Sequence, residues 1–163
     1  MPASSQVKFT IHNFGVAVDG TFAVKAGFFR FHPASLMQAR GEVTVEIKTI
    51  ATGIALRDRH LLKEEYFAAQ SYPTAHIVVN AVKKREAGYW AEGMLRIKGI
   101  TKKVGFLLEG LLEQNGQMKL AGRFSLTRSE FGIGGRSWSL GDEVNVVFEM
   151  MWQRDLSPAR QTP

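Results

Sequence analysis

The sequence contains no cysteine, which excludes disulfide bonds, thiolate zinc sites and cysteine nucleophiles. No stretch approaches the roughly 20 apolar residues that a membrane-spanning helix needs, and no charged-then-apolar signal peptide opens the chain. The four histidines, His12, His32, His60 and His76, lack the spacing of metal ligands. We therefore expect no metal site and no stable membrane insertion.

Catalytic motifs are also missing. No serine stands in a nucleophile motif, and Asp58 and His60 are too close in sequence to indicate a triad by themselves. The glycine-rich segment 132–135 lacks the strand–turn–helix setting of a nucleotide cradle. We expect a protein that is not an enzyme and needs no cofactor; an enzyme acting on hydrophobic substrates is the less favoured alternative.

Positive charge is in excess, with a formal net charge of +6 and a pI near 9.8. Such a field favours anionic partners, including nucleic acid. The densest clusters are Lys83-Lys84-Arg85 and Lys98 with Lys102 and Lys103, at expected hairpin ends where solvated lysines are common. The aromatic residues lie mostly on the apolar face of the alternation, so we expect a solubilising rim and no nucleic acid.

Alternation of apolar and polar residues dominates the 163 residues, as Val43, Val45 and Ile47 show against their polar neighbours. This pattern predicts strands that bury one face, and the length suits a single domain spanning 1–163 with an ordered core of about 6–153. Gly27 predicts a bend or bulge in the second strand. The strands are expected at 6–12, 18–31, 41–49, 74–84, 88–98, 102–112, 117–127 and 142–152.

Short turns at 86–88, 98–101 and 114–116 join the later strands into a meander, and the last contains an Asn-Gly pair suited to tight hairpins. Residues 56–67 break the alternation and predict one helix, which Asp58 would cap and Pro73 would follow. Eight meandering strands leave exposed edges unless the sheet closes. We expect an all-β, eight-stranded antiparallel barrel with one short helix; a two-sheet sandwich is the alternative.

Four blocks of the sequence resemble the YceI-like family of lipid-binding proteins. They are Thr52–Leu61 followed by Tyr66-Phe67 and Tyr72-Pro73, then Gly93–Lys102, Thr127–Gly134, and Gly141–Val144. The resemblance implies an extended, lipocalin-like β-barrel whose interior binds a polyisoprenoid, a quinone tail, a fatty amide or another long-chain lipid. It also implies a bacterial periplasmic or secreted protein, with the cytoplasm as the alternative, and leaves open a homodimer.

Aromatic, aliphatic and methionine side chains on the apolar face are our candidates for ligand contacts, although each could equally be core packing. These candidates are Phe9, Ile11, Phe22, Phe29, Phe31, Val45, Ile47, Met94, Phe106, Met118, Phe124, Phe131, Val146 and Phe148. A barrel filled by these side chains, acting as a stress-associated interaction module without cargo, is the alternative function.

Three basic residues, Arg57, His60 and Arg128, could bind the headgroup of a lipid at the mouth of the barrel. The structural alternative makes Arg57 or Arg128 part of a buried ion pair that fixes the helix to the barrel. We favour the structural alternative, because a buried charge in a lipid pocket is costly unless it is paired.

Overall fold

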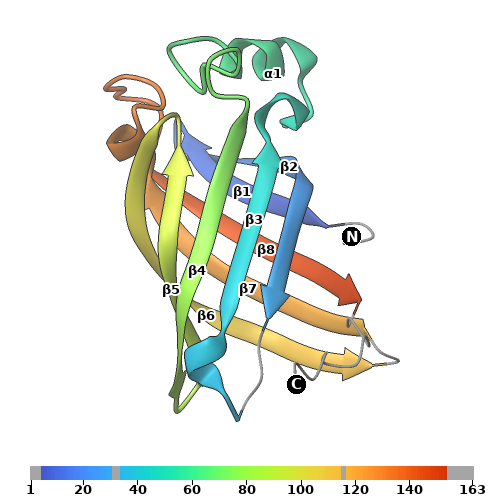
Figure 1. The fold of residues 1–163 in the computed structure, drawn as a ribbon. Helices are drawn as coiled ribbons and strands as arrows, with labels where there is room; N and C mark the ends of the chain where they lie inside the picture. The colour runs from blue at the N-terminus through green and yellow to red at the C-terminus, as the bar shows by residue number, and fades with distance from the viewer. Residues whose placement is uncertain (1–4, 31–33, 115–116, 154–163) are drawn as a thin grey trace.

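The computed structural model describes residues 5–30, 34–114 and 117–153, and they form a closed barrel of eight strands (Figure 1). Every strand pairs antiparallel with the next, and β1 also pairs with β8, so the sheet closes without an open edge. The expected eight-stranded barrel is confirmed and the sandwich is wrong. The strands are β1 (Gln6–Asn13), β2 (Val16–Arg30), β3 (Arg40–Glu46), β4 (Thr74–Arg85), β5 (Gly88–Ile97), β6 (Ile100–Gln114), β7 (Gln117–Thr127) and β8 (Glu143–Gln153).

Two hairpins at the top of Figure 1 are joined by two-residue turns with positive φ at both positions. In the β5–β6 turn, Lys98 and Gly99 have φ of 50° and 76°, and in the β1–β2 turn, Phe14 and Gly15 have φ of 51° and 74°. This geometry matches the right-handed twist of the strands and normally selects glycine, asparagine or aspartate. The expected Asn115-Gly116 turn lies outside the described residues.

The predicted helix at 56–67 is wrong in its length, because helix α1 covers only Ala55–Leu61. The chain then turns back, and the Phe67 backbone N–H donates to the Leu61 carbonyl so that Ala68 and Ala69 become buried. Asp58 does not cap this helix; its carboxylate accepts hydrogen bonds from the backbone N–H and the hydroxyl of Thr52. Burial of the apolar end of the segment therefore outweighs its helix propensity.

Two further boundaries differ from expectation. The third strand ends at Glu46, and the next residues form the 3₁₀ helix η2 (Ile47–Thr49), in which buried Ile47 donates its backbone N–H to the Pro73 carbonyl. The irregularity in β2 falls between Val24 and Ala26, whereas Gly27 pairs regularly with Val43. The other short helices are η1 (Leu36–Gln38) and η3 (Arg128–Phe131).

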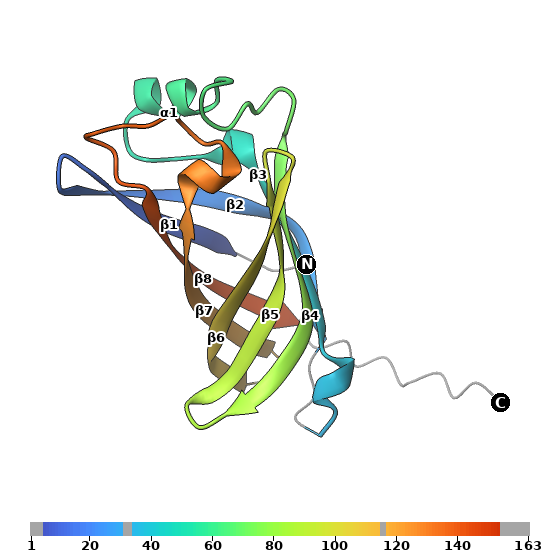
Figure 2. The ribbon, with the colours of Figure 1, turned by 90° about the vertical axis from the view of Figure 1, so that its left-hand side faces the viewer.

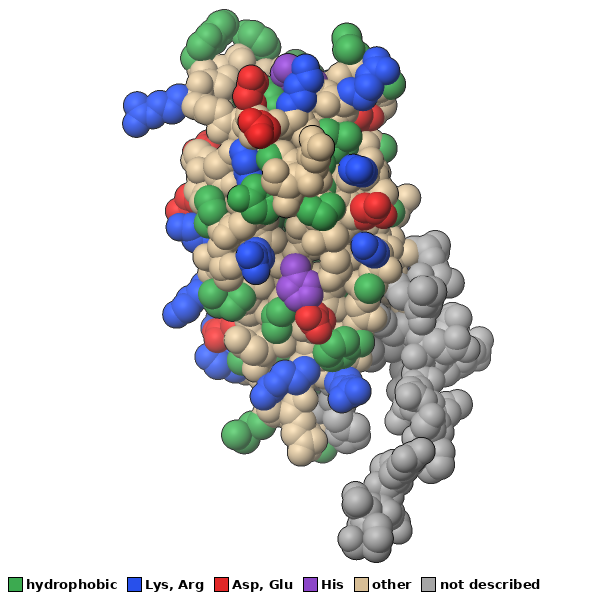
Figure 3. Space-filling model, turned by 45° about the horizontal axis from the view of Figure 1, so that its top comes forward, with side chains coloured by type: hydrophobic (Ala, Val, Ile, Leu, Met, Phe, Trp, Pro, Cys, Tyr) green, Lys and Arg blue, Asp and Glu red, His purple; other side chains and the backbone are tan. Residues whose placement is uncertain are grey.

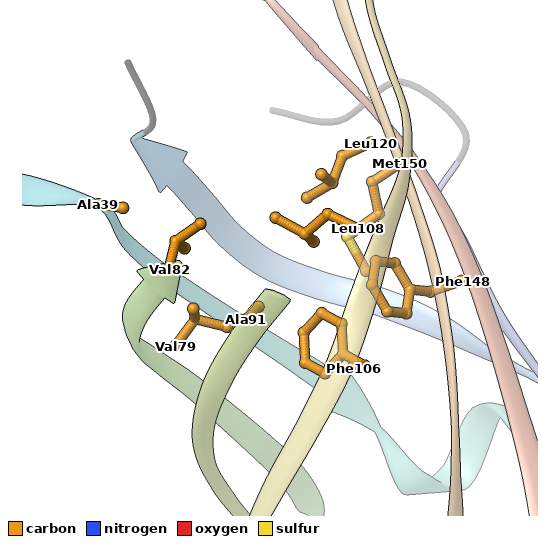
Figure 4. Close-up of a cluster of buried hydrophobic side chains, with 9 residues drawn as sticks. All are labelled: Ala39, Val79, Val82, Ala91, Phe106, Leu108, Leu120, Phe148 and Met150. Atoms are coloured by element: carbon orange, nitrogen blue, oxygen red, sulfur yellow. The ribbon is translucent and has the colours of Figure 1, made fainter. Parts of the chain in front are cut away.

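The apolar interior divides into a lower and an upper cluster. The lower cluster, drawn in Figure 4, fills the end of the barrel near η1 with Ala39, Val79, Val82, Ala91, Phe106, Leu108, Leu120, Phe148 and Met150. The upper cluster lies beneath α1 and η3 and contains Phe22, Ile47, Ile50, Ala69, Ala75, Leu95, Ile97, Phe131 and Ile133. The strand residues of the two clusters lie on inward-facing positions, whereas Ala39, Ile47, Ile50, Ala69, Phe131 and Ile133 come from the segments between strands.

Two long segments, 47–73 and 128–142, cover the top of the barrel (Figure 2). Lys98 in the β5–β6 turn joins them, because its ammonium donates to the carbonyls of Glu64 at 2.6 Å and Gly132 at 2.8 Å. The Gly134 backbone N–H also donates to the Glu65 carbonyl. In the described ranges, no helix has the length and apolar character needed to cross a membrane.

The facing of β8 gives a stability prediction. Val146 is buried inside the barrel, whereas its neighbour Val147 is 48% exposed on the outer face. Val146→Asp should lower the free energy of unfolding by on the order of 3–5 kcal/mol, because it places an unpaired charge in an apolar interior. Val147→Asp is the matched control and should change the free energy of unfolding by less than about 1 kcal/mol. Urea denaturation measures both, and equal losses would contradict the assigned register.

Candidate ligand-binding site

A cavity of about 230 Å³ runs between the inner faces of the strands and reaches the segments that cover the top. It brings together ten of the residues that the sequence singled out for ligand contact. These are Phe9, Ile11, Phe22, Phe29, Val45, Ile47, Phe106, Phe124, Val146 and Phe148. The volume shows that the barrel has room for something other than its own side chains. The lining of this space is almost entirely apolar.

Four candidates are not placed at this cavity. Met94 is half-buried on the outer face of β5, because its neighbours Leu95 and Ile97 are the residues that point inward. Phe131 is only 1% exposed and packs in the upper cluster without lining the cavity. Phe31 lies outside the described residues, as does the side chain of Met118.

The cavity also has walls that strand alternation does not predict. Leu61, Tyr66 and Phe67 reach it from α1 and the turns after it, and Leu140 reaches it from the segment before β8. These residues lie in irregular segments, whose direction depends on tertiary contacts rather than on periodicity. Only the family resemblance of the Tyr66-Phe67 block indicated that this part of the chain matters.

Three aromatic rings on the inner wall face a glycine on the neighbouring strand. Phe9 pairs with Gly20, Phe29 with Gly41, and Phe148 with Gly122. A Cβ atom at Gly41 would lie 2.6 Å from Cδ2 of Phe29, and Cβ atoms at the other two glycines would overlap their rings too. Because glycine leaves this space free, each ring can lie over the neighbouring strand. The arrangement leaves the middle of the barrel open.

The β1–β8 ladder is interrupted beside this cavity. Strands β1 and β8 pair through Gln6–Thr10, and β1 meets the later chain again at a bridge between Asn13 and Leu140. Between these points half-buried Ile11 and Val144 line the cavity. The interruption lies beside the β1–β2 turn, at the covered end of the barrel.

Arg57 is a half-buried cation of the cavity lining. Its Nε donates to the Thr52 hydroxyl at 2.8 Å and its Nη2 to the Thr52 carbonyl at 2.7 Å. Within the described residues it has no carboxylate partner, because Asp58 bonds to Thr52 instead. Arg57 is thus positioned by Thr52, with charge left available toward the cavity.

Arg128 is 3% exposed, and its guanidinium donates to the carbonyls of Ile133, Gly135, Leu140 and Gly141 at 2.8–3.2 Å. Asp142 lies 3.9 Å from its Nε. Hydrogen bonds from the hydroxyl and backbone N–H of Ser129, supported by the Arg128 charge, lower the pKa of Asp142. Arg128 therefore has a structural role, but it holds the 133–142 segment through backbone carbonyls and does not form the ion pair to the helix that the structural alternative expected.

His60, the third headgroup candidate, is exposed on α1 and does not line the cavity. Its ring packs against Tyr66 with centroids 5.3 Å apart. Of the three basic candidates, Arg57 alone combines a place at the cavity with unused hydrogen-bonding capacity.

One array on the outside of the barrel has the residue types of a catalytic triad. His76 Nδ1 lies 2.8 Å from the Thr44 hydroxyl, and its Nε2 lies 2.8 Å from Glu42. Thr44, however, lies within β3, paired on both sides with Ala26 and His76, so no backbone N–H groups converge to form an oxyanion hole. We interpret the array as a cross-strand polar contact. In the described ranges, no three histidine or acidic residues cluster as metal ligands.

Comparison with known proteins agrees with this architecture. The YceI-like domain profile matches residues 1–152. A UPF0312 protein of Photorhabdus laumondii is 33% identical over 99 residues, which are 60% of this chain and 52% of that protein. The chain thus matches about half the length of this curated relative.

Solved structures show the same fold. The crystal structure of BcnA from Burkholderia cenocepacia superposes with a TM-score of 0.81 at 23% identity, covering 91% of this chain and 96% of BcnA. A polyisoprenoid binding domain from Saccharophagus degradans, implicated in plant cell wall breakdown, gives 0.67 at 11% identity, covering 92% and 94%. With the profile match over nearly its whole length, the chain belongs to the YceI-like family.

Proposed function

We propose that this protein binds a long-chain amphiphilic lipid in the barrel interior and transports or stores it. The candidates are a polyisoprenoid, a quinone tail or a fatty amide. The observation that carries the proposal is the apolar cavity that the Phe–Gly pairs leave open in an otherwise well-packed barrel. The similar Saccharophagus domain, which is named for polyisoprenoid binding, supports the same class of ligand.

The apolar lining indicates how a chain would gain affinity. Each CH₂ group buried there contributes about 0.8 kcal/mol before the entropy of ordering the chain. A tail too long for the cavity of about 230 Å³ would need rotation of the lining rings.

The polar end of the ligand would lie at Arg57. A phosphate or carbonyl oxygen there would accept a charge-assisted hydrogen bond from a guanidinium already oriented by Thr52. Arg128 is unsuited to this role, since four carbonyls use its donors.

Binding without chemical conversion is the function that we propose, because the described site presents rings, aliphatic walls and the guanidinium groups of Arg57 and Arg128 but no nucleophile with an oxyanion hole. From the family resemblance we keep the periplasm or cell exterior as the expected compartment, with the cytoplasm as the alternative.

Direct measurement of uptake tests the proposal. The purified protein should bind geraniol, farnesol and geranylgeraniol one-to-one in native mass spectrometry. Affinity should rise with chain length and level off once the tail exceeds the cavity, because only buried groups contribute. Protein that stays empty with every prenol, quinone and fatty amide would contradict lipid binding and favour the interaction module without cargo.

Gly41→Ala tests whether the lumen is the binding site. The new methyl group would meet the Phe29 ring and displace it toward the cavity, so farnesol affinity should fall on the order of tenfold. Gly135→Ala is the matched control, because a Cβ atom at Gly135 would have nothing within 4 Å of it. Farnesol titrations followed by native mass spectrometry compare them, and equal affinities would place the ligand outside the lumen.

Arg57→Met tests the headgroup site. Loss of the guanidinium should weaken farnesyl phosphate binding about tenfold while leaving farnesol binding within about twofold, because only the phosphate uses the charge. Arg59→Met, on the same helix but away from the cavity lining, is the control. A parallel loss for alcohol and phosphate, or a loss in the control, would exclude Arg57 as the headgroup ligand.

A further inference from the structure

Exposed hydrophobic side chains concentrate at the covered end of the barrel. Of the ten large hydrophobic residues exposed among the described part of the chain, seven belong to the turns and segments at this end. They are Phe14, Val16, Ile54, Leu56, Tyr72, Ile100 and Trp138. Single exposed apolar residues are common on protein surfaces, but a group at one end marks an interaction surface.

Five of these residues are close in sequence to residues that line the cavity. Phe14 follows Asn13, and Val16 and Trp138 each stand two positions before a lining residue, Val18 and Leu140. Ile54 and Leu56 lie in the segment between the lining residues Thr52 and Arg57. We call Phe14, Val16, Ile54, Leu56 and Trp138 the apolar rim.

The structure holds the most exposed part of the apolar rim in place. Trp138 is 91% exposed, and its ring stacks edge-on against Phe14 with centroids 5.1 Å apart. The Phe14 backbone N–H donates to the Ser139 carbonyl at 2.8 Å, and the Arg128 contacts fix the Trp138 segment from below.

The conformation of Phe14 adds a second indication. It occupies the left-handed region with φ of 51°, at a turn position where glycine or asparagine is favoured. A bulky aromatic residue in this conformation is strained. Burial in the core does not compensate for the strain, because 66% of the Phe14 surface is exposed. Strain of this kind concentrates at functional sites, so the side chain is suited to contact outside the molecule.

Basic side chains surround the same end. Arg59, Lys63 and Arg136 are exposed there, and Figure 3 shows basic, acidic and hydrophobic side chains together at the top of the molecule. The exposed acidic residues of the covering segments are Glu64, Glu65, Glu130 and Asp142, and exposed Lys102 and Lys103 beside the β5–β6 turn add to the basic residues of this end. Tryptophan and phenylalanine beside cations, on a chain of net charge +6, fit the interface of an anionic bilayer.

We propose that the apolar rim docks reversibly on the surface of an anionic phospholipid bilayer and places the covered end of the cavity against the bilayer. The inference rests on the proposed lipid binding and adds where the ligand is exchanged. The bilayer fits better than a second copy of the chain, because Arg59, Lys63 and Arg136 would meet anionic headgroups on a bilayer but the same cations on a second copy. Contact involves side chains at the interface and no spanning segment.

Cosedimentation with vesicles tests the docking. The protein should bind vesicles of phosphatidylcholine containing phosphatidylglycerol, with weaker binding in high salt and to phosphatidylcholine alone. The double substitution Phe14→Ser with Trp138→Ser should lower the vesicle partition coefficient by at least about tenfold. Met37→Ser is the matched control, since Met37 is 92% exposed at the opposite end, and it should leave partitioning unchanged.

The same variants separate docking from ligand binding. Docking predicts that the double variant binds farnesol from solution as the wild type does but extracts it from vesicles more slowly. Wild-type protein that takes up farnesol but does not sediment with anionic vesicles would overturn docking and leave lipid binding intact. Failure of farnesol uptake by every form would instead overturn lipid binding. A wild-type dimer that the double substitution converts to a monomer would overturn docking by assigning the rim to a second copy.

Discussion

The open interior of this barrel depends on where three phenylalanine rings can lie. Eight strands enclose a space that side chains fill unless something holds them back. Phe9, Phe29 and Phe148 would occupy that space if their cross-strand neighbours carried side chains of ordinary size, but each neighbour is a glycine. The rings line the wall instead, and an apolar cavity lies between two packed clusters. The glycines thus let large apolar side chains line a cavity instead of filling it.

A second constraint acts at the covered end, where long segments with little regular structure must hold a fixed shape. Arg128 supplies it by donating to backbone carbonyls of the 128–142 segment. Lys98 does the same between the two segments from the outside. Two cations therefore fix the covering segments as strand pairing fixes the rest of the barrel, and neither depends on a closely paired carboxylate.

The strands were predictable because alternation reports burial on one face, and all eight lie within a few residues of their predicted ranges. The inner residues of β1, β3 and β8 followed from the same rule. Leu61 and Tyr66 did not, because the chain after α1 folds back to bury Ala68 and Ala69 through contacts distant in sequence. Met94 was misassigned because methionine suits either face, and only the register with Leu95 shows that it points outward. The Phe–Gly pairs could not be predicted, since they require the register between strands.

The seam that closes the barrel is its weakest ladder. Strands β1 and β8 share five register pairs, whereas β7 and β8 share eleven. Widening the barrel by separating β1 from β8 beyond Thr10 breaks no ladder pairs and only one isolated bridge, at Asn13 and Leu140. This end of the seam is therefore the part of the wall that would separate with the fewest backbone pairs lost. Separation there would leave α1 and the segments around it packed.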